Sequence, residues 1–311
     1  MQASLQYIWE QLQGYYPDSE IRSLSYRIME SVCQVDKQTL LRGKDKQLSA
    51  KDLVQIRKIT EELKKYRPLQ YILGETEFYG LPFRMNGHVL IPRPETEELV
   101  EWIIGREQAK AQDAGYRILD VGTGSGCIAI ALAKHLPEAE VYALDISEKA
   151  LELAEENARL NKVNIRFFQY DILAPFSGHY VPFFGQSIQF ITHDVQFYGQ
   201  DIQFSSTPFF DILVSNPPYI TPSEKHRMTP NVLAYEPHQA LFTPENQPLL
   251  FYERIADFGQ AFLKPGGRIF FETNALFGEA VAEMLRQKGY EKVGVKQDMA
   301  GKDRMAGGCK I

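Results

Sequence analysis

The sequence predicts an α/β protein in which an open, doubly wound, mostly parallel sheet follows a small helical bundle. Helical periodicity dominates the N-terminal part, whereas short apolar runs alternate with helical segments from residue 117 onward. Two unusual turns, one rich in glycine and one in proline, each follow an apolar run that predicts a buried strand. Because ligands of open α/β sheets bind at the carboxyl ends of strands, both turns are candidates for a functional site.

The composition limits the possible classes of protein. The chain has 311 residues, of which 44% are hydrophobic and 24% charged, so it is long enough for two domains with an ample core. The net charge of −6 and the pI near 5.6 argue against a nucleic-acid substrate. Cys33, Cys127 and Cys309 are far apart and the histidines lack metal-ligand spacing, so we expect neither disulfides nor a metal site. Without a secretory segment or an apolar span of membrane length, we expect a cytoplasmic protein with no membrane partner.

Residues 1–75 are predicted to form the helical bundle. Apolar side chains fall on one helical face over residues 5–12 and on another over 21–32. Ser49-Ala50-Lys51-Asp52 has the capping-box pattern that begins a further helix. This periodicity indicates packing of helices and does not tell whether the outer face of the bundle binds a partner.

Residues 76–94 are predicted to be a β-hairpin that links the two domains. The apolar stretches around Gly80-Leu81-Pro82 and Asn86-Gly87 are typical of strands joined by tight turns. An amphipathic helix is expected to begin next, at Glu95 or Thr96, and to open the second domain, 95–311.

The glycine-rich turn follows the predicted strand 117–121 and opens a helix of small and aliphatic residues. Glycines at such a place let backbone N–H groups and the helix N-terminus approach a ligand closely. The spacing is G-x-G-x-G, which differs from the dinucleotide pattern, and the Lys of a phosphate-binding P-loop is missing. The residues that we expect to contact a cofactor here are Gly122, Thr123, Gly124, Ser125 and Gly126.

An acidic residue, Asp145, ends the next predicted strand, 141–144. A carboxylate in this position can accept hydrogen bonds from both hydroxyls of a ribose. Neither this carboxylate nor the glycine turn identifies a ligand by itself.

The proline-rich turn is Ser215-Asn216-Pro217-Pro218-Tyr219, and it follows the apolar run 209–214. The two prolines remove two N–H donors and fix φ near −65°, and Pro217 favours extended geometry at Asn216. The turn therefore offers an amide side chain, free carbonyls and an aromatic ring at Tyr219. We call this turn, residues 215–219, the hook. Its acceptors and ring suit a planar group that carries an NH₂, although a Pro-Pro pair after a strand is by itself only a turn signal.

The glycine turn, the acidic strand end and Asn-Pro-Pro-Tyr, in this order, resemble the S-adenosylmethionine-dependent methyltransferases that methylate planar nitrogen. Almost the whole chain is similar to one family of these enzymes, the release-factor glutamine methyltransferases (PrmC/HemK family). The stretches that carry the resemblance are 68–74, 78–83, 90–97, 216–220, 235–241 and 301–304. The pairing of Ile91-Pro92-Arg93-Pro94-Glu95-Thr96-Glu97 with Asn-Pro-Pro-Tyr is specific to the family.

The resemblance implies a Rossmann-like class I methyltransferase domain with a seven-stranded sheet, and S-adenosyl-L-methionine as cofactor. It implies that the substrate is the glutamine of a Gly-Gly-Gln motif in peptide chain release factors, and that the bundle binds the release factor. Asn216, Pro217 and Tyr219 would be catalytic, and Pro218 would join them in binding the substrate. By analogy with the family, Asp171 and Ile172 lie beside the adenine, and Asn216 also contacts the cofactor.

The rest of the second domain continues as α/β. Helices are expected over 248–263 and 277–287, strands over 268–272 and from 292, and an antiparallel strand at the edge of the sheet.

Residues 174–208 form an insertion relative to the family pattern and contain almost no charged side chains. The triplets Ile188-Gln189-Phe190, Val195-Gln196-Phe197 and Ile202-Gln203-Phe204 recur in it with a spacing of seven. The spacing of seven is typical of a coiled coil, but the prolines, glycines and β-branched residues argue against one and favour a mobile loop or short strands with no chemistry of their own.

Two other functions compete with glutamine methylation. A nucleic-acid amino-methyltransferase would apply the same hook to a flipped adenine or guanine, but it needs a basic surface that the acidic balance does not provide. A non-catalytic binding module on the same fold would not need both an intact glycine loop and an intact hook.

Overall fold

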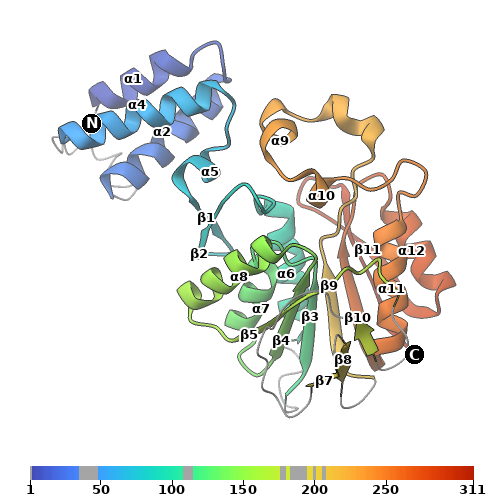
Figure 1. The fold of residues 1–311 in the computed structure, drawn as a ribbon. Coiled ribbons are helices and arrows are strands. Elements are labelled where there is room, and N and C mark those ends of the chain that lie inside the picture. The colour runs from blue at the N-terminus through green and yellow to red at the C-terminus, as the bar shows by residue number, and fades with distance from the viewer. Residues whose placement is uncertain are drawn as a thin grey trace. The chain divides into compact units, whose positions relative to one another are not determined.

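A computed structural model describes residues 2–34, 48–107, 115–175, 180–182, 195–198, 201–204 and 208–311 (Figure 1). The chain divides into two compact units. One comprises Met1–Glu75 and Met228–Tyr235, and the other Thr76–Arg227 and Glu236–Ile311. Within the described ranges, no helix is both long and apolar enough to cross a membrane.

The first unit is a helical bundle, as predicted. Its helices are α1 (Gln2–Leu12), α2 (Asp18–Cys33), α4 (Ala50–Lys64), α5 (Leu69–Leu73) and α9 (Pro230–Tyr235). Ile8, Ile28 and Ile59 are among the side chains buried in its core. The predicted capping box is present: the Ser49 hydroxyl accepts from the Asp52 N–H at 3.2 Å, and the Asp52 carboxylate accepts from the Ser49 N–H at 2.9 Å.

The segment Met228–Tyr235 belongs to the bundle although the chain on both sides of it belongs to the second unit. The Tyr235 hydroxyl donates to the Lys65 carbonyl at 2.8 Å, at the end of α4. The domain boundaries drawn from the sequence did not include this excursion, because a bond between residues 170 positions apart leaves no local pattern.

The predicted hairpin is formed by β1 (Glu75–Phe78) and β2 (Leu81–Arg84). The two connecting residues, Tyr79 and Gly80, have φ of +50° and +72°, as a two-residue hairpin turn requires. Tyr79 carries a side chain in this left-handed region, and its N–H donates to the Glu97 carboxylate at 2.7 Å. Contact with the following helix thus holds the turn in place.

Seven strands form the sheet of the second unit in the order β11-β12-β10-β9-β3-β4-β5. The strands are β3 (Arg117–Val121), β4 (Glu140–Asp145), β5 (Ile165–Gln169), β9 (Phe210–Ser215), β10 (Leu263–Glu272), β11 (Tyr290–Gln297) and β12 (Asp303–Lys310). β10, β9, β3, β4 and β5 run parallel. The edge strand β11 pairs antiparallel with β12, as the sequence predicted. β12 is antiparallel to β10 as well, so the strand that runs against the five parallel ones lies one position inside the edge. The hairpin β11–β12 folds back, so that β12 pairs with β10 and β11 becomes the edge.

Helices cover both faces of this sheet (Figure 1). α6 (Pro94–Glu107), α7 (Cys127–His135) and α8 (Glu148–Asn161) pack on one face, and α11 (Leu250–Phe262) and α12 (Gly278–Gln287) on the other. The central strands are buried on both sides, which explains their nearly continuous apolar runs. The shorter elements between β9 and α11 are the 3-10 helix η2 (Pro222–Arg227), α9 and α10 (His238–Leu241).

The insertion contains three short strands, β6 (Tyr180–Pro182), β7 (Val195–Tyr198) and β8 (Asp201–Phe204), which form an antiparallel sheet in the order β6-β8-β7. Of the two alternatives drawn from the sequence, short strands are therefore correct. The second and third triplets lie on β7 and β8, whereas 188–190 falls outside the described residues.

The strand order reverses at β3, and this reversal positions the site. From β3 the chain builds β4 and β5 on one side and then returns to place β9 on the other. Val121 and Ser215, the last residues of β3 and β9, are directly paired, and the Ser215 hydroxyl donates to the Val121 carbonyl at 2.6 Å. The glycine turn and the proline-rich turn therefore leave the same edge of the sheet side by side, at the crevice where such folds bind ligands.

Candidate active site

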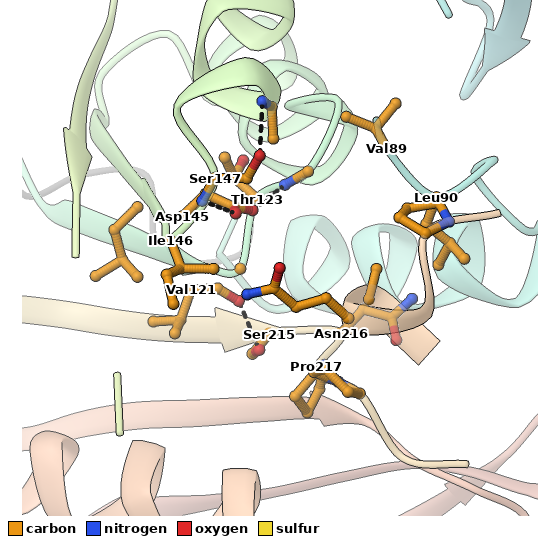
Figure 2. A pocket seen from close by; sticks show the side chains of 18 of the residues that line it. Val89, Leu90, Val121, Thr123, Asp145, Ile146, Ser147, Ser215, Asn216 and Pro217 are labelled. Carbon is orange, nitrogen blue, oxygen red and sulfur yellow. Dashed lines mark hydrogen bonds between the residues drawn. The ribbon is translucent and has the colours of Figure 1, made fainter. Parts of the chain in front are cut away.

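A cavity of about 500 Å³ lies at this edge and brings the two predicted turns together (Figure 2). Thr123, Asp145 and Ser147 lie together in one part of it, and Asn216 and Pro217 in another (Figure 2). Its lining comes from residues 87–90, 92, 96, 121–125, 127–128, 144–147, 150, 170–173, 215–218, 237, 239–240, 242, 251 and 255.

The glycine loop is fixed by backbone hydrogen bonds to the neighbouring strand. The N–H groups of Gly122 and Thr123 both donate to the Leu144 carbonyl at 2.9 Å. Gly122 and Gly124 have φ of +74° and +55°, and a Cβ built on either would meet no atom within 4 Å. The loop thus presents open space above bare backbone, as close approach of a ligand requires.

Asp145 ends β4 and braces this loop. One carboxylate oxygen accepts from the Gly124 N–H at 2.8 Å and the other from the Ser147 N–H at 2.9 Å. Burial raises the pKa of Asp145, and the N–H donors of Ser147 and Gly124 oppose that rise. Each carboxylate oxygen can accept a second hydrogen bond, so two hydroxyls of a ligand can still be accommodated.

Ser125 and Gly126 have different roles although they are adjacent. Ser125 is 2% exposed and lines the cavity, and its hydroxyl has no hydrogen-bond partner within the part of the chain that the structure describes. A buried polar group of this kind requires a partner, which a ligand can supply. Gly126 is not among the lining residues; a Cβ there would lie 3.0 Å from Ile130 and 3.1 Å from Ala154, so its absence allows α7 and α8 to pack closely.

Asp171 and Ile172, which follow β5, both line the cavity. The Asp171 carboxylate accepts from the Leu173 N–H at 2.9 Å, and Ile172 is 8% exposed. The pair places an acceptor and an apolar surface beside each other, which suits the edge and the face of an adenine ring.

Asn216, Pro217 and Pro218 line the cavity, whereas Tyr219 is not among the lining residues. The Asn216 amide group donates from Nδ2 to Thr96 Oγ1 at 3.2 Å. The Tyr219 ring packs against the core beside α11, and its hydroxyl donates to Glu272 Oε1 at 3.2 Å. The structure thus gives Tyr219 an anchoring position, not that of an exposed aromatic wall.

Thr96 and Glu272 are site residues that the sequence analysis did not single out. Glu272 ends β10, is 1% exposed, and accepts from the Thr96 hydroxyl at 2.5 Å through Oε2. Burial raises the pKa of Glu272 to about 7. Asp145 was predicted as a site residue because an acid ends a parallel strand there. Glu272 ends β10 in the same way, so the same signal could have identified it.

An ion pair between a buried glutamate and a partly exposed arginine supports another part of the cavity. Glu236, almost fully buried, contacts the Arg93 guanidinium at 2.7 Å, and its second oxygen accepts from the Ile91 N–H at 3.3 Å. The pair ties the lining stretch 87–92 to the lining stretch 237–242. No cluster of His, Cys, Asp and Glu that could hold a metal ion is found in the described ranges.

Comparisons with known proteins agree with this geometry. A family model described as "Methyltransferase domain" matches residues 112–298, and one described as "PrmC N-terminal domain" matches residues 4–74. A release factor glutamine methyltransferase of Flavobacterium psychrophilum is 42% identical over 294 residues, which is 94% of this chain and 93% of the relative. The corresponding protein of Bacteroides thetaiotaomicron is 42% identical over 299 residues, 96% of each chain, and that of Lactococcus lactis 37% identical over 279 residues, 89% of this chain and 90% of the relative.

The seven-stranded sheet and the matching family model define a class I methyltransferase. More narrowly, the chain belongs to the release factor glutamine methyltransferase family. The fold and the family expected from the sequence are thereby confirmed, and the roles of individual residues remain predictions.

Proposed function

We propose that this protein transfers a methyl group from S-adenosyl-L-methionine to the side-chain amide nitrogen of the glutamine in the Gly-Gly-Gln motif of peptide chain release factors. The observation that carries the proposal is that an open glycine loop and an Asn-Pro-Pro turn line the same cavity. The family membership supports the same reaction.

The residues present fit the cofactor. The open space above Gly122 and Gly124 accepts a ligand, and the unpartnered Ser125 hydroxyl needs a polar group from one. Asp145 would hold the ribose hydroxyls, and Asp171 and Ile172 would border the adenine. When bound, S-adenosylmethionine supplies an electrophilic methyl group on a sulfonium.

A carboxamide is a weak nucleophile, because its nitrogen lone pair is delocalised into its carbonyl. The hook would compensate by orienting the amide group of the substrate. Asn216 Oδ1 and the Pro217 carbonyl would accept the two amide hydrogens and thereby orient the nitrogen toward the methyl group. These contacts strengthen as positive charge develops on nitrogen, so they act in the transition state as well as in binding. The cationic methylated amide is acidic enough to lose its proton to water, and we assign no residue as a base.

The lining residues within 87–92 and 237–242 would border the part of the cavity that holds the substrate. A Gly-Gly-Gln loop is flexible, and its glycines permit close backbone approach, so a glutamine side chain can extend into the cavity. We further propose that the helical bundle binds the body of the release factor, as its match to the PrmC N-terminal domain supports.

The test incubates the protein with S-adenosylmethionine and, separately, a release factor, duplex DNA or ribosomal RNA, followed by mass spectrometry. We expect one added methyl group, on the motif glutamine alone. A release factor with asparagine in its place should not be methylated, because the side chain is one methylene too short for near-attack geometry. Methylation of another residue, or of a nucleic acid instead, would contradict the proposal.

A further inference from the structure

Both ends of the hook converge on one buried carboxylate. Asn216 donates to Thr96, Thr96 donates to Glu272 Oε2, and Tyr219 donates to Glu272 Oε1. Thr96 is 2% exposed and Glu272 1%, so water does not compete for these bonds. Of these four hydrogen-bonded residues, Asn216 and Thr96 line the cavity, whereas Tyr219 and Glu272 are not among the lining residues.

We propose that Glu272, acting through Thr96, is a positioning residue that determines which atom of the Asn216 amide faces the substrate. The inference rests on the proposed function of Asn216 as an acceptor for the substrate amide. It assigns Thr96 and Glu272 a part in the reaction without direct contact with the reacting atoms.

The direction of each hydrogen bond carries the argument. An ionised carboxylate only accepts, so the hydroxyls of Thr96 and Tyr219 must both donate to Glu272. A threonine hydroxyl has a single proton, so Thr96 can then only accept from Asn216. The Asn216 NH₂ is therefore turned toward Thr96, and Oδ1 is left for the cavity.

Protonation of Glu272 reverses this chain of bonds. A protonated carboxyl donates, and a Thr96 hydroxyl that accepts this proton can offer its own to Asn216 Oδ1. The amide would then present NH₂ to the cavity, opposite the NH₂ of the substrate. Two donors cannot bond, so the hook would lose its acceptor.

The surroundings of Glu272 make this switch accessible near neutral pH. Burial raises its pKa to about 7, while the charge of Arg304 on β12 lowers it and Glu95 on α6 raises it. Burial also raises the pKa values of Tyr219, Tyr252 and Cys127, so these neighbours remain neutral in that range. Asp120, beneath the glycine loop, also has a pKa raised by burial to about 7, so a pH profile must be combined with variants.

The first experiment measures kcat on a release factor for Thr96→Val, Thr96→Ser and Glu272→Gln. We expect kcat to fall about tenfold or more for Thr96→Val and Glu272→Gln, with cofactor affinity unchanged, because one preorganised acceptor is lost. Thr96→Ser keeps the hydroxyl and should stay within about threefold of wild type. The double variant should be little worse than the worse single one, because both changes break one chain of bonds.

A matched control is Glu107→Gln, the same substitution of a buried glutamate that pairs with Arg268 in the middle of β10. It should alter stability and leave kcat and its pH dependence as in wild type. The kcat of the wild type should decrease as the pH is lowered through about 7, and the kcat of Glu272→Gln should not show this decrease. Wild-type kcat in Thr96→Val would overturn the inference, and this variant decides even if Glu272→Gln does not fold.

A second readout does not depend on the substrate. The ¹⁵N side-chain signal of Asn216, assigned by its loss in Asn216→Asp, should shift with an apparent pKa near 7 in wild type and not in Glu272→Gln. If no release factor is methylated but this shift is seen, the proposed function fails and the positioning role stands. If the wild type methylates its substrate but the Asn216 signal does not shift with pH, the positioning role is overturned and the proposed function stands.

Discussion

The glycine loop and the hook meet in one cavity, but they are held in place by different kinds of interaction. The loop is fixed by backbone groups and by partners close in sequence: Asp145 is 21 positions from Gly124, and Asp120 is 3 from Thr123. The hook is fixed by side chains, across separations of 120, 176 and 53 residues. The loop therefore depends on two strands that are consecutive in the chain, β3 and β4, whereas the hook depends on elements from distant parts of the chain.

Asn216→Ala should have the largest effect, and it tests the hook side. Losing a preorganised acceptor should lower turnover by about 100-fold or more while cofactor affinity stays nearly intact. Asn216→Asp keeps an acceptor and should retain modest activity. Steady-state kinetics with calorimetry of cofactor binding separates the two effects, and full activity of Asn216→Ala would remove the hook from the mechanism.

Asp145→Ala tests the loop side and should show the opposite pattern. It removes a charged acceptor, so cofactor affinity should weaken by about 1.5–3 kcal/mol, with turnover at saturating cofactor close to wild type. Asp257→Ala, which removes an aspartate that pairs with Lys288, is the control and should bind the cofactor normally. Wild-type affinity in Asp145→Ala would refute the ribose assignment.

The sequence predicted the loop better than the hook for a physical reason. Gly122, Gly124 and Asp145 belong to one strand-turn-helix-strand segment, so their spacing implies their proximity. Asn216 was predicted from the strand before it and the prolines after it, which are also local. The family resemblance paired the stretch that contains Thr96 with Asn-Pro-Pro-Tyr but gave Thr96 no role. The hydrogen bonds that join Asn216, Thr96 and Glu272 could not be predicted without the sheet order, because the three residues lie on or beside α6, β9 and β10.

Tyr219 and Gly126 show that a sequence motif does not tell which of its residues line the cavity. Both lie inside the recognised motifs, yet Tyr219 anchors the hook to Glu272 and Gly126 allows α7 to approach α8. A motif contains residues that touch ligands and residues that support the turn. Only packing distinguishes the two kinds.

Glu236→Gln should have a smaller effect, on stability. The substitution weakens the pair with Arg93 and the bond from the Ile91 N–H, so unfolding free energy should fall by about 1–3 kcal/mol. Thermal denaturation measures the loss. Glu283→Gln, on the exposed face of α12 and paired with Arg286, should leave Tm unchanged; an equal loss in both variants would mean that burial of the Glu236 pair is unimportant.

The smallest expected effect is a change in how stability depends on pH, and it compares the two regions directly. Each has one buried acid whose pKa burial raises to about 7: Asp120 beneath the loop and Glu272 behind the hook. The folded protein then binds more protons than the unfolded chain between the ordinary carboxyl pKa and about 7. Stability should therefore decrease as pH rises through this interval.

Asp120→Asn and Glu272→Gln should each flatten this decrease, and their Tm values measured from pH 5 to 8 give the two contributions. Turnover should separate the variants, because only Glu272 is connected to Asn216 through Thr96. Glu272→Gln should lose the decline of kcat below about pH 7, and Asp120→Asn should keep it. If Asp120→Asn instead loses this decline of kcat and Glu272→Gln keeps it, the group that makes turnover depend on pH lies beneath the glycine loop. The hook would then be the part of the site that does not depend on pH.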